Sequence, residues 1–298
     1  MPIALIHAGG VAGEYATLAA AVAAAQDGDT VRLPAGTYRN PFADIHARIT
    51  IAGVGGMARL VADRFPDDGR AILRSTVSVT LENLDISGAT DPGGNGAAIL
   101  HVGGDLTIAD CAIHDNQNGL LAGPDVAAIG TITITHSLFS ANGSGTGYTH
   151  DIYVGRNDPT YPGRPVRLVI THSVIEGAVV GHEVKSRADT TIIRDSVIDS
   201  GPAGTDSYAV DLPNGGIGVI EDDVLRKGVG AENRAFIHFG GEGLLHAVNT
   251  LSVTGNAVTS DYPGPALLVA NAIPGATVTV SGNVLHGMAG LLAPSARP

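Results

Sequence analysis

Four short segments in the second half of the chain combine basic, acidic, imidazole and phenol side chains. They are residues 148–153 (YTHDIY), 181–187 (GHEVKSR), 211–216 (DLPNGG) and 232–238 (ENRAFIH). In an extended strand every second side chain points the same way, so Glu183, Lys185 and Arg187 would share one face. Arginine binds carboxylates through its planar guanidinium group, and imidazole and phenol groups transfer protons. These residue types predict binding of an anionic ligand, with acid–base chemistry beside it.

A repeated local pattern indicates which elements position these segments. Eight apolar anchors are each followed, five positions later, by another apolar residue: Leu81, Ile108, Ile134, Ile170, Ile193, Ile220, Val253 and Val280. Most copies carry a small or polar residue three positions after the anchor: Leu84, Cys111, Ser137, Ser173, Ser196, Asp223, Asn256 and Asn283. The spacing between copies is irregular. A fixed local pattern at irregular spacing predicts a solenoid whose strands stay in register while its loops vary.

Each copy of the repeat has two expected strands. The first surrounds the anchor, where apolar and polar residues alternate. The second strands are predicted at Ile99–Val102, Gly119–Ala122, Ile152–Gly155, Val184–Ser186, Ala209–Leu212, Phe236–Phe239 and Leu267–Ala270. An antiparallel sandwich would give hairpins and not an eightfold repeat with matching inward positions. We therefore expect an all-β solenoid.

The first part of the chain is interpreted as a cap. Residues 1–40 are expected to form the cap and the first coil, and residues 41–298 the solenoid, as one domain overall. Residues 14–17 (EYAT) are expected to lead into an Ala-rich helix that ends near Gly28, followed by a strand that begins at Thr30. A solenoid needs such a cover, because an open terminal coil exposes strand edges and core side chains.

Aligning the second strands places one unusual column on the outer face. Tyr153, Lys185, Asp211 and His238 lie at the same position of four successive coils, and the column is apolar beyond them, at Leu121 and Val269. Strands lie about 4.8 Å apart, so the four residues span about 14 Å. By the same alternation Asp151 and Glu183 are expected two positions upstream on this face, and Arg187 two positions downstream. The turn after Asp211 is expected to bring Asn214 near the same surface.

Simpler interpretations account for some of these residues. Lys185 with Asp211, and Arg187 with Glu183, can form cross-strand ion pairs without any function. Several other residues are expected to be structural. Tyr208 and His246 are assigned to packing or a loop, His136 and His172 to the turns, Cys111 to a buried inert thiol, and Asp223, Asn256 and Asn283 to a polar ladder that caps turn backbone groups.

Composition limits the possible partners. Lys and Arg total 17 against 29 Asp and Glu, so the formal net charge is −12, which argues against a nucleic-acid partner. Seven Tyr, five Phe and no Trp leave the core to Val, Ile, Leu and Ala. No window is long and apolar enough to span a membrane. The Ala-rich stretch from Tyr15 to Ala25 follows Glu14 and not a basic region, so it is not interpreted as a signal peptide.

The coil repeat and the capped entry resemble the pectin-lyase-like superfamily of right-handed parallel β-helix proteins. The resemblance covers nearly the whole chain and implies an all-β, right-handed parallel β-helix of about ten coils with a short N-terminal capping helix. It also implies an extracellular or cell-surface location and an acidic polysaccharide as partner. The Asp-Pro-His-Asp string expected of alginate epimerases is absent.

Within that superfamily, the residues favour a polysaccharide lyase that cleaves a uronic-acid polymer by β-elimination. Lys185 is the expected base, because neighbouring cations and partial burial would lower its pKa. Arg187 is expected to pair with the substrate carboxylate, and Tyr153, His150 or His238 to supply the acid. Asp211, Asn214 and Tyr148 are expected to bind substrate.

The metal dependence of this lyase and the choice between it and two other functions stay open at the level of sequence. Related lyases often use Ca²⁺ to neutralise the uronate, and Asp151 with Glu183 or Asp211 would offer oxygen ligands for it. The same three carboxylates would serve a glycoside hydrolase, which needs two of them. A third alternative is a β-helix that binds glycan or extends a surface without catalysis.

Overall fold

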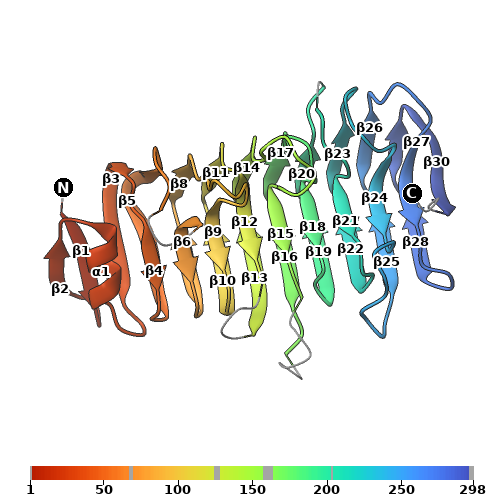
Figure 1. Ribbon diagram of the computed structural model, residues 1–298. Helices are drawn as coiled ribbons and strands as arrows, with labels where there is room; N and C mark the ends of the chain where they lie inside the picture. Colours follow the sequence, from red (N-terminus) through yellow and green to blue (C-terminus); the bar gives the residue numbers. More distant parts are fainter. Residues whose placement is uncertain (1, 67–69, 124–127, 157–163, 203, 295–298) are drawn as a thin grey trace.

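Residues 2–66, 70–123, 128–156, 164–202 and 204–294 are described by a computed structural model of the chain. It is an elongated stack of coils, with the N-terminal cap at one end and the last coil at the other (Figure 1). Neighbouring strands of successive coils pair in parallel, whereas β1 pairs antiparallel with β2 and β3. Parallel pairing of successive coils excludes the antiparallel sandwich. The expected right-handed parallel β-helix is confirmed.

Each regular coil contributes three strands and not the two expected from the sequence. The first face is formed by β7 (Val79–Glu82), β10 (Gly104–Ala109), β13 (Ile129–Thr135), β16 (Arg167–Thr171), β19 (Thr190–Arg194), β22 (Ile217–Glu221), β25 (Thr250–Thr254) and β28 (Thr277–Ser281). The second face is formed by β8 (Leu84–Ser87), β11 (Ala112–His114), β14 (Leu138–Ser140), β17 (Val174–Glu176), β20 (Val197–Asp199), β23 (Val224–Lys227), β26 (Ala257–Ser260) and β29 (Val284–His286).

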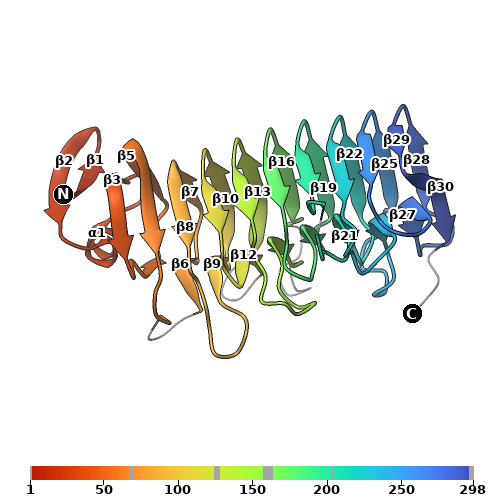
Figure 2. The same ribbon diagram turned by 90° about the horizontal axis from the view of Figure 1, so that it is seen from above.

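The third face is a separate ten-stranded sheet, one strand per coil, which agrees with the expected number of coils. Its strands are β4 (Ala43–Ile45), β6 (Ala71–Ser75), β9 (Ala97–His101), β12 (Asn118–Ala122), β15 (Ile152–Val154), β18 (Val184–Ser186), β21 (Val210–Leu212), β24 (Ala235–Phe239), β27 (Ala266–Asn271) and β30 (Met288–Pro294). Seen from above, the coils succeed one another at even spacing along the stack (Figure 2). This sheet corresponds to the second strands expected from the sequence.

A sharp corner divides the first two faces. The residue two positions after each anchor adopts a left-handed backbone conformation, for example Asn83 at φ 54° and His172 at φ 50°. That corner cannot be seen in the apolar pattern, because both the anchor and the residue five positions later point into the core. The two inward positions therefore belong to different strands.

The polar ladder expected at this corner is confirmed. Each ladder side chain accepts a hydrogen bond from the backbone N–H of the preceding rung: Ser137 Oγ from Cys111, Ser173 Oγ from Ser137, Ser196 Oγ from Ser173, Asp223 Oδ1 from Ser196, Asn256 Oδ1 from Asp223 and Asn283 Oδ1 from Asn256. Backbone groups at a tight buried corner need such partners. Cys111 is buried, as expected.

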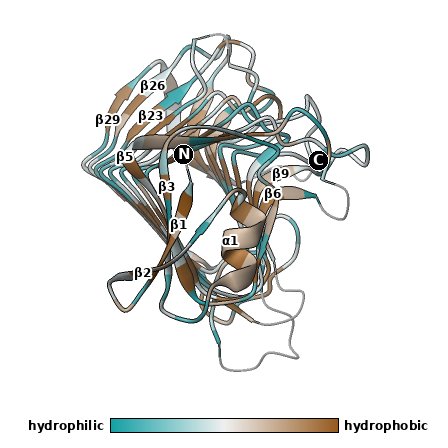
Figure 3. Ribbon diagram, turned by 90° about the vertical axis from the view of Figure 1, so that its left-hand side faces the viewer, coloured by the Kyte–Doolittle hydropathy of each residue, from teal (hydrophilic) through white to brown (hydrophobic). Residues whose placement is uncertain are grey.

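The entry of the solenoid is covered by α1 (Leu18–Ala24) together with β1 (Ile3–His7) and β2 (Gly10–Tyr15). The view along the axis shows α1 in front of the stacked coils (Figure 3). Thr17 caps the helix by accepting from the Ala20 N–H at 3.3 Å, and Leu18, Ala21 and Val22 are buried. Long strands β3 (Thr30–Arg39) and β5 (Ile49–Val61) then connect the cap to the regular coils. Within the described ranges, no helix is long and apolar enough to cross a membrane.

Candidate functional site

The outward column predicted from the sequence exists. In the third face Tyr153 pairs with Lys185, Lys185 with Asp211, and Asp211 with His238, so the four side chains lie on adjacent strands β15, β18, β21 and β24. Leu121 precedes Tyr153 in the column, as expected. On the other side, Val269 was expected to follow His238 in the column. The structure shifts β27 by one position, so that Ala270 pairs with His238 and Val269 pairs with Ile237.

Asp211 is the centre of this column. Its Oδ2 lies 2.9 Å from Lys185 Nζ and 3.3 Å from His182 Nε2, and its Oδ1 lies 2.9 Å from His238 Nδ1. Burial alone would raise the pKa of this carboxyl, but the hydrogen bond from His238 and the charges around it lower the pKa to about 2. Asp211 is therefore an ionised acceptor that fixes the positions of three cationic or imidazole groups.

Lys185 and Arg187 hold a second carboxylate that sequence reasoning did not identify. Glu242, in the loop after β24, places Oε1 2.8 Å from Lys185 Nζ and pairs through Oε2 with Arg187 Nη2. Arg187 does not pair with Glu183, contrary to expectation. Glu242 has no register position in any strand, so the repeat gave no signal for it. Its only sequence signal is its place three residues after the end of a column strand.

The expectation that neighbouring cations and burial lower the pKa of Lys185 is wrong. Burial is the largest single influence and lowers the pKa of Lys185, but the ion pairs with Asp211 and Glu242 together outweigh it, so that the pKa is raised. A protonated ammonium group cannot accept a proton. Lys185 is instead suited, together with Arg187, to neutralising an anion.

Asp151 and Glu183 do not lie on the outer face. Both are fully buried, because β15 and β18 begin only at Ile152 and Val184 and the chain bends just before them. Asp151 Oδ1 accepts from the Asn142 backbone N–H at 3.1 Å, and Glu183 Oε1 accepts from the Ala178 backbone N–H at 3.1 Å. They continue an inner ladder in which Asn142 Oδ1 accepts from the Asn116 backbone N–H. Capping of corner amides explains why the outward alternation fails at both positions.

These two carboxyls do not fit a Ca²⁺ site. Burial raises the pKa of Asp151 to about 6 and the pKa of Glu183 well above its ordinary value, and the neighbouring Asp151 raises the pKa of Glu183 further. Such shifts favour the protonated carboxyls, whereas Ca²⁺ requires ionised oxygens. In the part of the chain that the structure describes, no group of three or more His, Cys, Asp or Glu side chains could hold a metal ion.

A row of stacked rings lies beside the column. Ring centroids are 5.9 Å apart for Tyr153 and His150, 4.9 Å for His150 and His182, 5.4 Å for His182 and Tyr208, and 4.7 Å for Tyr208 and His238. Tyr208, expected to be a packing residue, is one member. The row supports the outer face along four coils.

His150 and His182 are neutral members of this row. His150 Nδ1 accepts from the His182 backbone N–H at 3.1 Å, and His182 Nδ1 accepts from the Tyr208 backbone N–H at 3.2 Å. Burial lowers the pKa of His182 to about 4 and the pKa of His150 well below its ordinary value. A neutral, buried imidazole is a poor proton donor, so the structure argues against His150 as the acid.

His238 differs from the other two histidines. Since the ionised Asp211 carboxyl can only accept, Nδ1 of His238 carries the hydrogen and Nε2 of the neutral ring has a free lone pair. Among the described residues, none is hydrogen-bonded to Nε2. Gly241 lies against this edge of the ring: a Cβ at position 241 would come within 2.9 Å of Nε2. The Asp211–His238 pair is thus an oriented base beneath a glycine loop.

A cleft of about 640 Å³ opens next to these groups. It is lined by Asn95, Leu121, Gly147, Tyr148, His150, Tyr153, His182, Lys185, Arg187, Ser207, Glu232 and Glu242. Tyr148 is 89% exposed at its rim, and Tyr153 Oη accepts from Arg187 Nε at 3.0 Å. Asn214 lies where the turn was expected to bring it: its Oδ1 accepts from Arg187 Nη1. Of the expected site residues, five line the cleft: Tyr148, His150, Tyr153, Lys185 and Arg187. Asp211 and Asn214 do not line it but contact Lys185 and Arg187, and His238 contacts Asp211. Asp151 and Glu183 face the interior.

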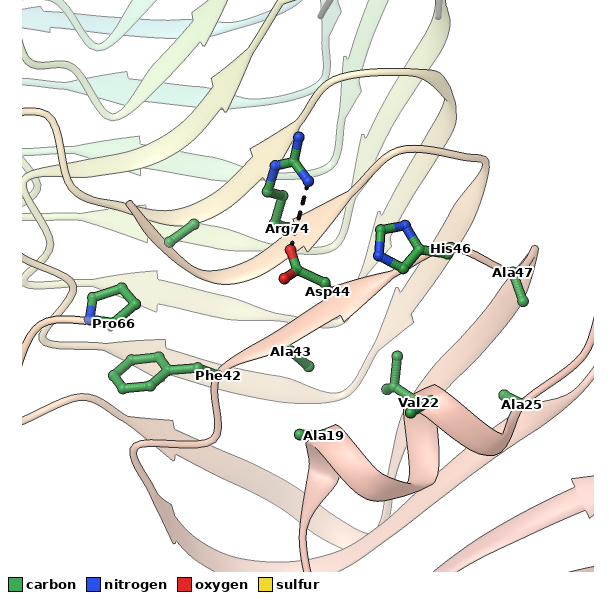
Figure 4. A pocket seen from close by; sticks show the side chains of 12 residues that line it. Ala19, Val22, Ala25, Phe42, Ala43, Asp44, His46, Ala47, Pro66 and Arg74 are labelled. Carbon is green, nitrogen blue, oxygen red and sulfur yellow. Dashed lines mark ion pairs between the residues drawn. The ribbon is translucent and has the colours of Figure 1, made fainter. Parts of the chain in front are cut away.

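A second hollow, of about 570 Å³, lies at the other end of the solenoid (Figure 4). It is formed between α1 and strands β4 and β6, and most of its lining is apolar, including Val22 and Phe42. Asp44 and Arg74 form an ion pair at 3.7 Å on its wall. This hollow shares no residue with the column, and its own titratable side chains are Asp44, His46 and Arg74.

Comparisons with known proteins identify no family for the chain. No protein-family model matches the sequence, and no curated protein matches it. Among solved structures, the chain is similar to pectate lyase Pel9A, with 16% identity and a TM-score of 0.49 over 89% of this chain and 72% of that one. It is also similar to the pectin methylesterase from Aspergillus niger, with 13% identity and a TM-score of 0.43 over 97% of this chain and 85% of that one. At these identities the likeness concerns fold alone, and the chain is a right-handed parallel β-helix protein.

Proposed function

We propose that the cleft binds an acidic polysaccharide and cleaves it by β-elimination beside a uronic-acid unit. The observation that carries the proposal is the carboxylate already held between Lys185 and Arg187. A uronate carboxyl has the same charge and geometry as the Glu242 carboxyl. Lys185 also contacts Asp211, whose other oxygen orients His238, so the anion site adjoins an oriented base.

β-Elimination needs the carbon next to the carboxyl group to become acidic. Two cations on the carboxylate stabilise the negative charge that develops there in the transition state. Lys185 and Arg187 both keep their charge, since the pKa of each is raised by its ion pairs although burial lowers it. The groups that bind the anion are therefore charged at any pH at which the substrate is ionised.

His238 is the proposed base. Its Nε2 accepts the proton from the carbon next to the carboxyl group, and the C–H electron pair forms the new carbon–carbon double bond. The bond from the sugar to the neighbouring oxygen breaks, and that oxygen takes the proton from the imidazolium. Asp211 stabilises the imidazolium through Nδ1, as an ionised carboxylate does for a catalytic histidine.

Tyr153 serves a different sugar unit from His238 in this proposal. The two residues are three strands apart, about 14 Å between backbones, which is too far for both to act at one glycosidic bond. The Tyr153 hydroxyl accepts from Arg187 and can donate its own hydrogen outward. It is suited to binding the polymer next to the carboxylate site.

The carboxylates expected for a glycoside hydrolase are not placed for that reaction. A glycosidase needs one protonated and one ionised carboxyl on either side of the bond. Asp151 and Glu183 face the interior, and Asp211 is held ionised by three partners. Within the described residues, the carboxyls that line the cleft are Glu242, which is paired with both cations, and Glu232, which is exposed.

The test is to incubate the protein with acidic plant, algal and bacterial polysaccharides, with and without Ca²⁺. Product is read as ultraviolet absorbance of the unsaturated uronate and, separately, as new reducing ends. We expect unsaturated product from at least one polymer, and a loss of about 100-fold or more in His238→Gln, the scale of general-base catalysis. His286→Gln, in the exposed strand β29, is the matched control and should match the unaltered protein. Reducing ends without unsaturation would replace the lyase with a hydrolase. Binding without any product would make the protein a glycan-binding β-helix.

A further inference from the structure

We propose that Glu242 occupies the position of the substrate carboxylate, and that a uronate unit must displace it and lift the loop that carries it. This loop, residues 240–245, is called the strap below. The inference rests on the proposed binding of an acidic polysaccharide. It adds that a sugar with a free carboxylate can displace the strap and reach Lys185, Arg187 and His238, whereas a neutral or esterified sugar cannot.

The position of Glu242 is that of a ligand. Each of its oxygens pairs with one cation, as a bound carboxylate would divide itself between a lysine and an arginine. The side chain is 45% exposed, whereas Lys185 and Arg187 are 11% and 21% exposed beneath it. An anion that approaches from solvent therefore meets Glu242 before it can reach the two cations.

The strap is built to move more easily than the strands below it. Gly240, Gly241 and Gly243 all have positive φ, and no strand or helix includes them. Leu244 and Leu245 are 55% and 44% exposed, so they contribute little apolar burial. Segments with few buried apolar contacts open at the lowest free energy.

Polar ties from one side chain and from the backbone hold the strap down, and the Gly240 and Leu245 N–H groups donate to the carbonyl oxygens of Leu212 and Asn214 at 2.9 and 3.3 Å. Asn214 Nδ2 donates to the carbonyl oxygens of Glu242 and Gly243 at 3.0 and 2.9 Å. The Glu242 backbone N–H also donates to the Pro213 carbonyl at 3.0 Å. Asn214 accepts from Arg187 through Oδ1, so the same side chain touches both the strap and the anion site.

Opening the strap would expose the base together with the cations. Gly241 covers the Nε2 edge of His238, and a Cβ at its positive φ of 107° would press against the ring at 2.7 to 2.9 Å. A neutral or methyl-esterified sugar cannot replace Glu242 on Lys185 and Arg187, because it would leave Arg187 without a carboxylate partner and Lys185 with Asp211 alone. Only an ionised sugar carboxylate exchanges for Glu242 at little net cost, so the strap makes access to His238 depend on the charge of the ligand.

The experiment measures binding of trigalacturonate by calorimetry to the unaltered protein, to Glu242→Gln and to Glu221→Gln. Glu221 is the matched control, because it forms a comparable exposed ion pair with Arg194 at 2.9 Å on another face. If the open strap is populated at about one part in ten, Glu242→Gln binds about tenfold more tightly, while Glu221→Gln is unchanged. Amide hydrogen exchange in the strap should be faster in Glu242→Gln, and faster in the unaltered protein when trigalacturonate is added.

The inference is overturned if Glu242→Gln binds trigalacturonate equally well or more weakly than the unaltered protein. It is also overturned if amide exchange in the strap becomes slower when trigalacturonate is added, or if none of the three proteins binds trigalacturonate. The fully methyl-esterified trisaccharide should bind the unaltered protein more weakly than trigalacturonate, and equal affinity would also overturn it. The result is separable from the proposed cleavage. Tighter binding by Glu242→Gln without unsaturated product supports the strap and refutes the lyase, whereas product with unchanged affinity refutes the strap alone.

Discussion

Asp223 gives the sharpest test of the physical reasoning, because one carboxyl occupies a ladder otherwise made of neutral groups. Its Oδ1 accepts from the Ser196 backbone N–H at 2.8 Å, and its buried Oδ2 has no hydrogen-bond partner. Burial raises the pKa of Asp223 from 3.8 to about 7. The next rungs of the same ladder are Asn256 and Asn283. We predict that Asp223→Asn stabilises the protein at neutral pH.

The magnitude follows from the pKa. In the unfolded chain this carboxyl ionises near 3.8, but in the folded protein it keeps its proton until about pH 7. Because the folded pKa is raised, stability from this group is fully present below pH 3.8 and is lost as the pH rises toward 7. At about 1.4 kcal/mol per pH unit, the loss is about 4 kcal/mol, to be taken as an upper value.

Asparagine at this position keeps the shape and removes the charge. Its oxygen can still accept from Ser196, and its amide can donate as Asn256 Nδ2 does to the Ile220 carbonyl at 3.1 Å. We therefore expect Asp223→Asn and the unaltered protein to be equally stable at pH 4. Above pH 7 the variant should be more stable by about 2 to 4 kcal/mol.

The assay is urea unfolding followed by circular dichroism at pH 4, 6 and 8. Asp222→Asn is the matched control, since it removes the same charge from the neighbouring exposed residue, which also has a positive φ of 57°. Asn256→Asp is the reverse substitution and should lose stability as the pH rises. The reasoning would be refuted if the free energies of unfolding of Asp223→Asn and the unaltered protein differed by the same amount at pH 4 and at pH 8.

Three further outcomes follow from buried groups. Lys227 is fully buried, with Nζ 3.4 Å from Asp206 Oδ2, so Lys227→Met should lower the free energy of unfolding by about 3 to 5 kcal/mol, and adding Asp206→Asn should restore part of it in urea titrations. Burial raises the pKa of Glu183 well above its ordinary value, so Glu183→Gln should change stability at pH 7 by less than about 1 kcal/mol and leave the melting temperature insensitive to Ca²⁺; a Ca²⁺-dependent rise lost in the variant would contradict this. Burial raises the pKa of Cys111 to about 12, so a thiol reagent at pH 8 should react only after unfolding, and rapid reaction of the native protein would be the contrary result.

The repeat was sufficient for the architecture and for the column. Parallel coils repeat the same local pattern, so aligning the anchors also aligns the strands that follow them, and Tyr153, Lys185, Asp211 and His238 fall into register. The polar ladder was predictable for the same reason. The corner between the first two faces was not, because it depends on a left-handed residue and not on apolar spacing.

The chemical roles within the column were less predictable than its membership. Neighbouring cations were expected to lower the pKa of Lys185. Its nearest charges are instead the carboxylates of Asp211 and Glu242, which raise the pKa. Period-two alternation placed Asp151 and Glu183 outside, although the strands begin one residue later and the chain bends inward before them. Alternation holds only within a strand, and Asp151 and Glu183 precede the strand starts that were correctly expected at Ile152 and Val184.

By itself, the sequence determined the solenoid, its register and the four residues of the column, because these depend on local periodicity repeated along the chain. Tertiary structure alone decided that Glu242 crosses from its loop to Lys185 and Arg187, and that Asp211 gathers a lysine and two histidines. Loop paths and pKa values depend on packing between coils that are distant in sequence. The distinction between a row of polar residues and an oriented base beside an anion site therefore belongs to the folded molecule.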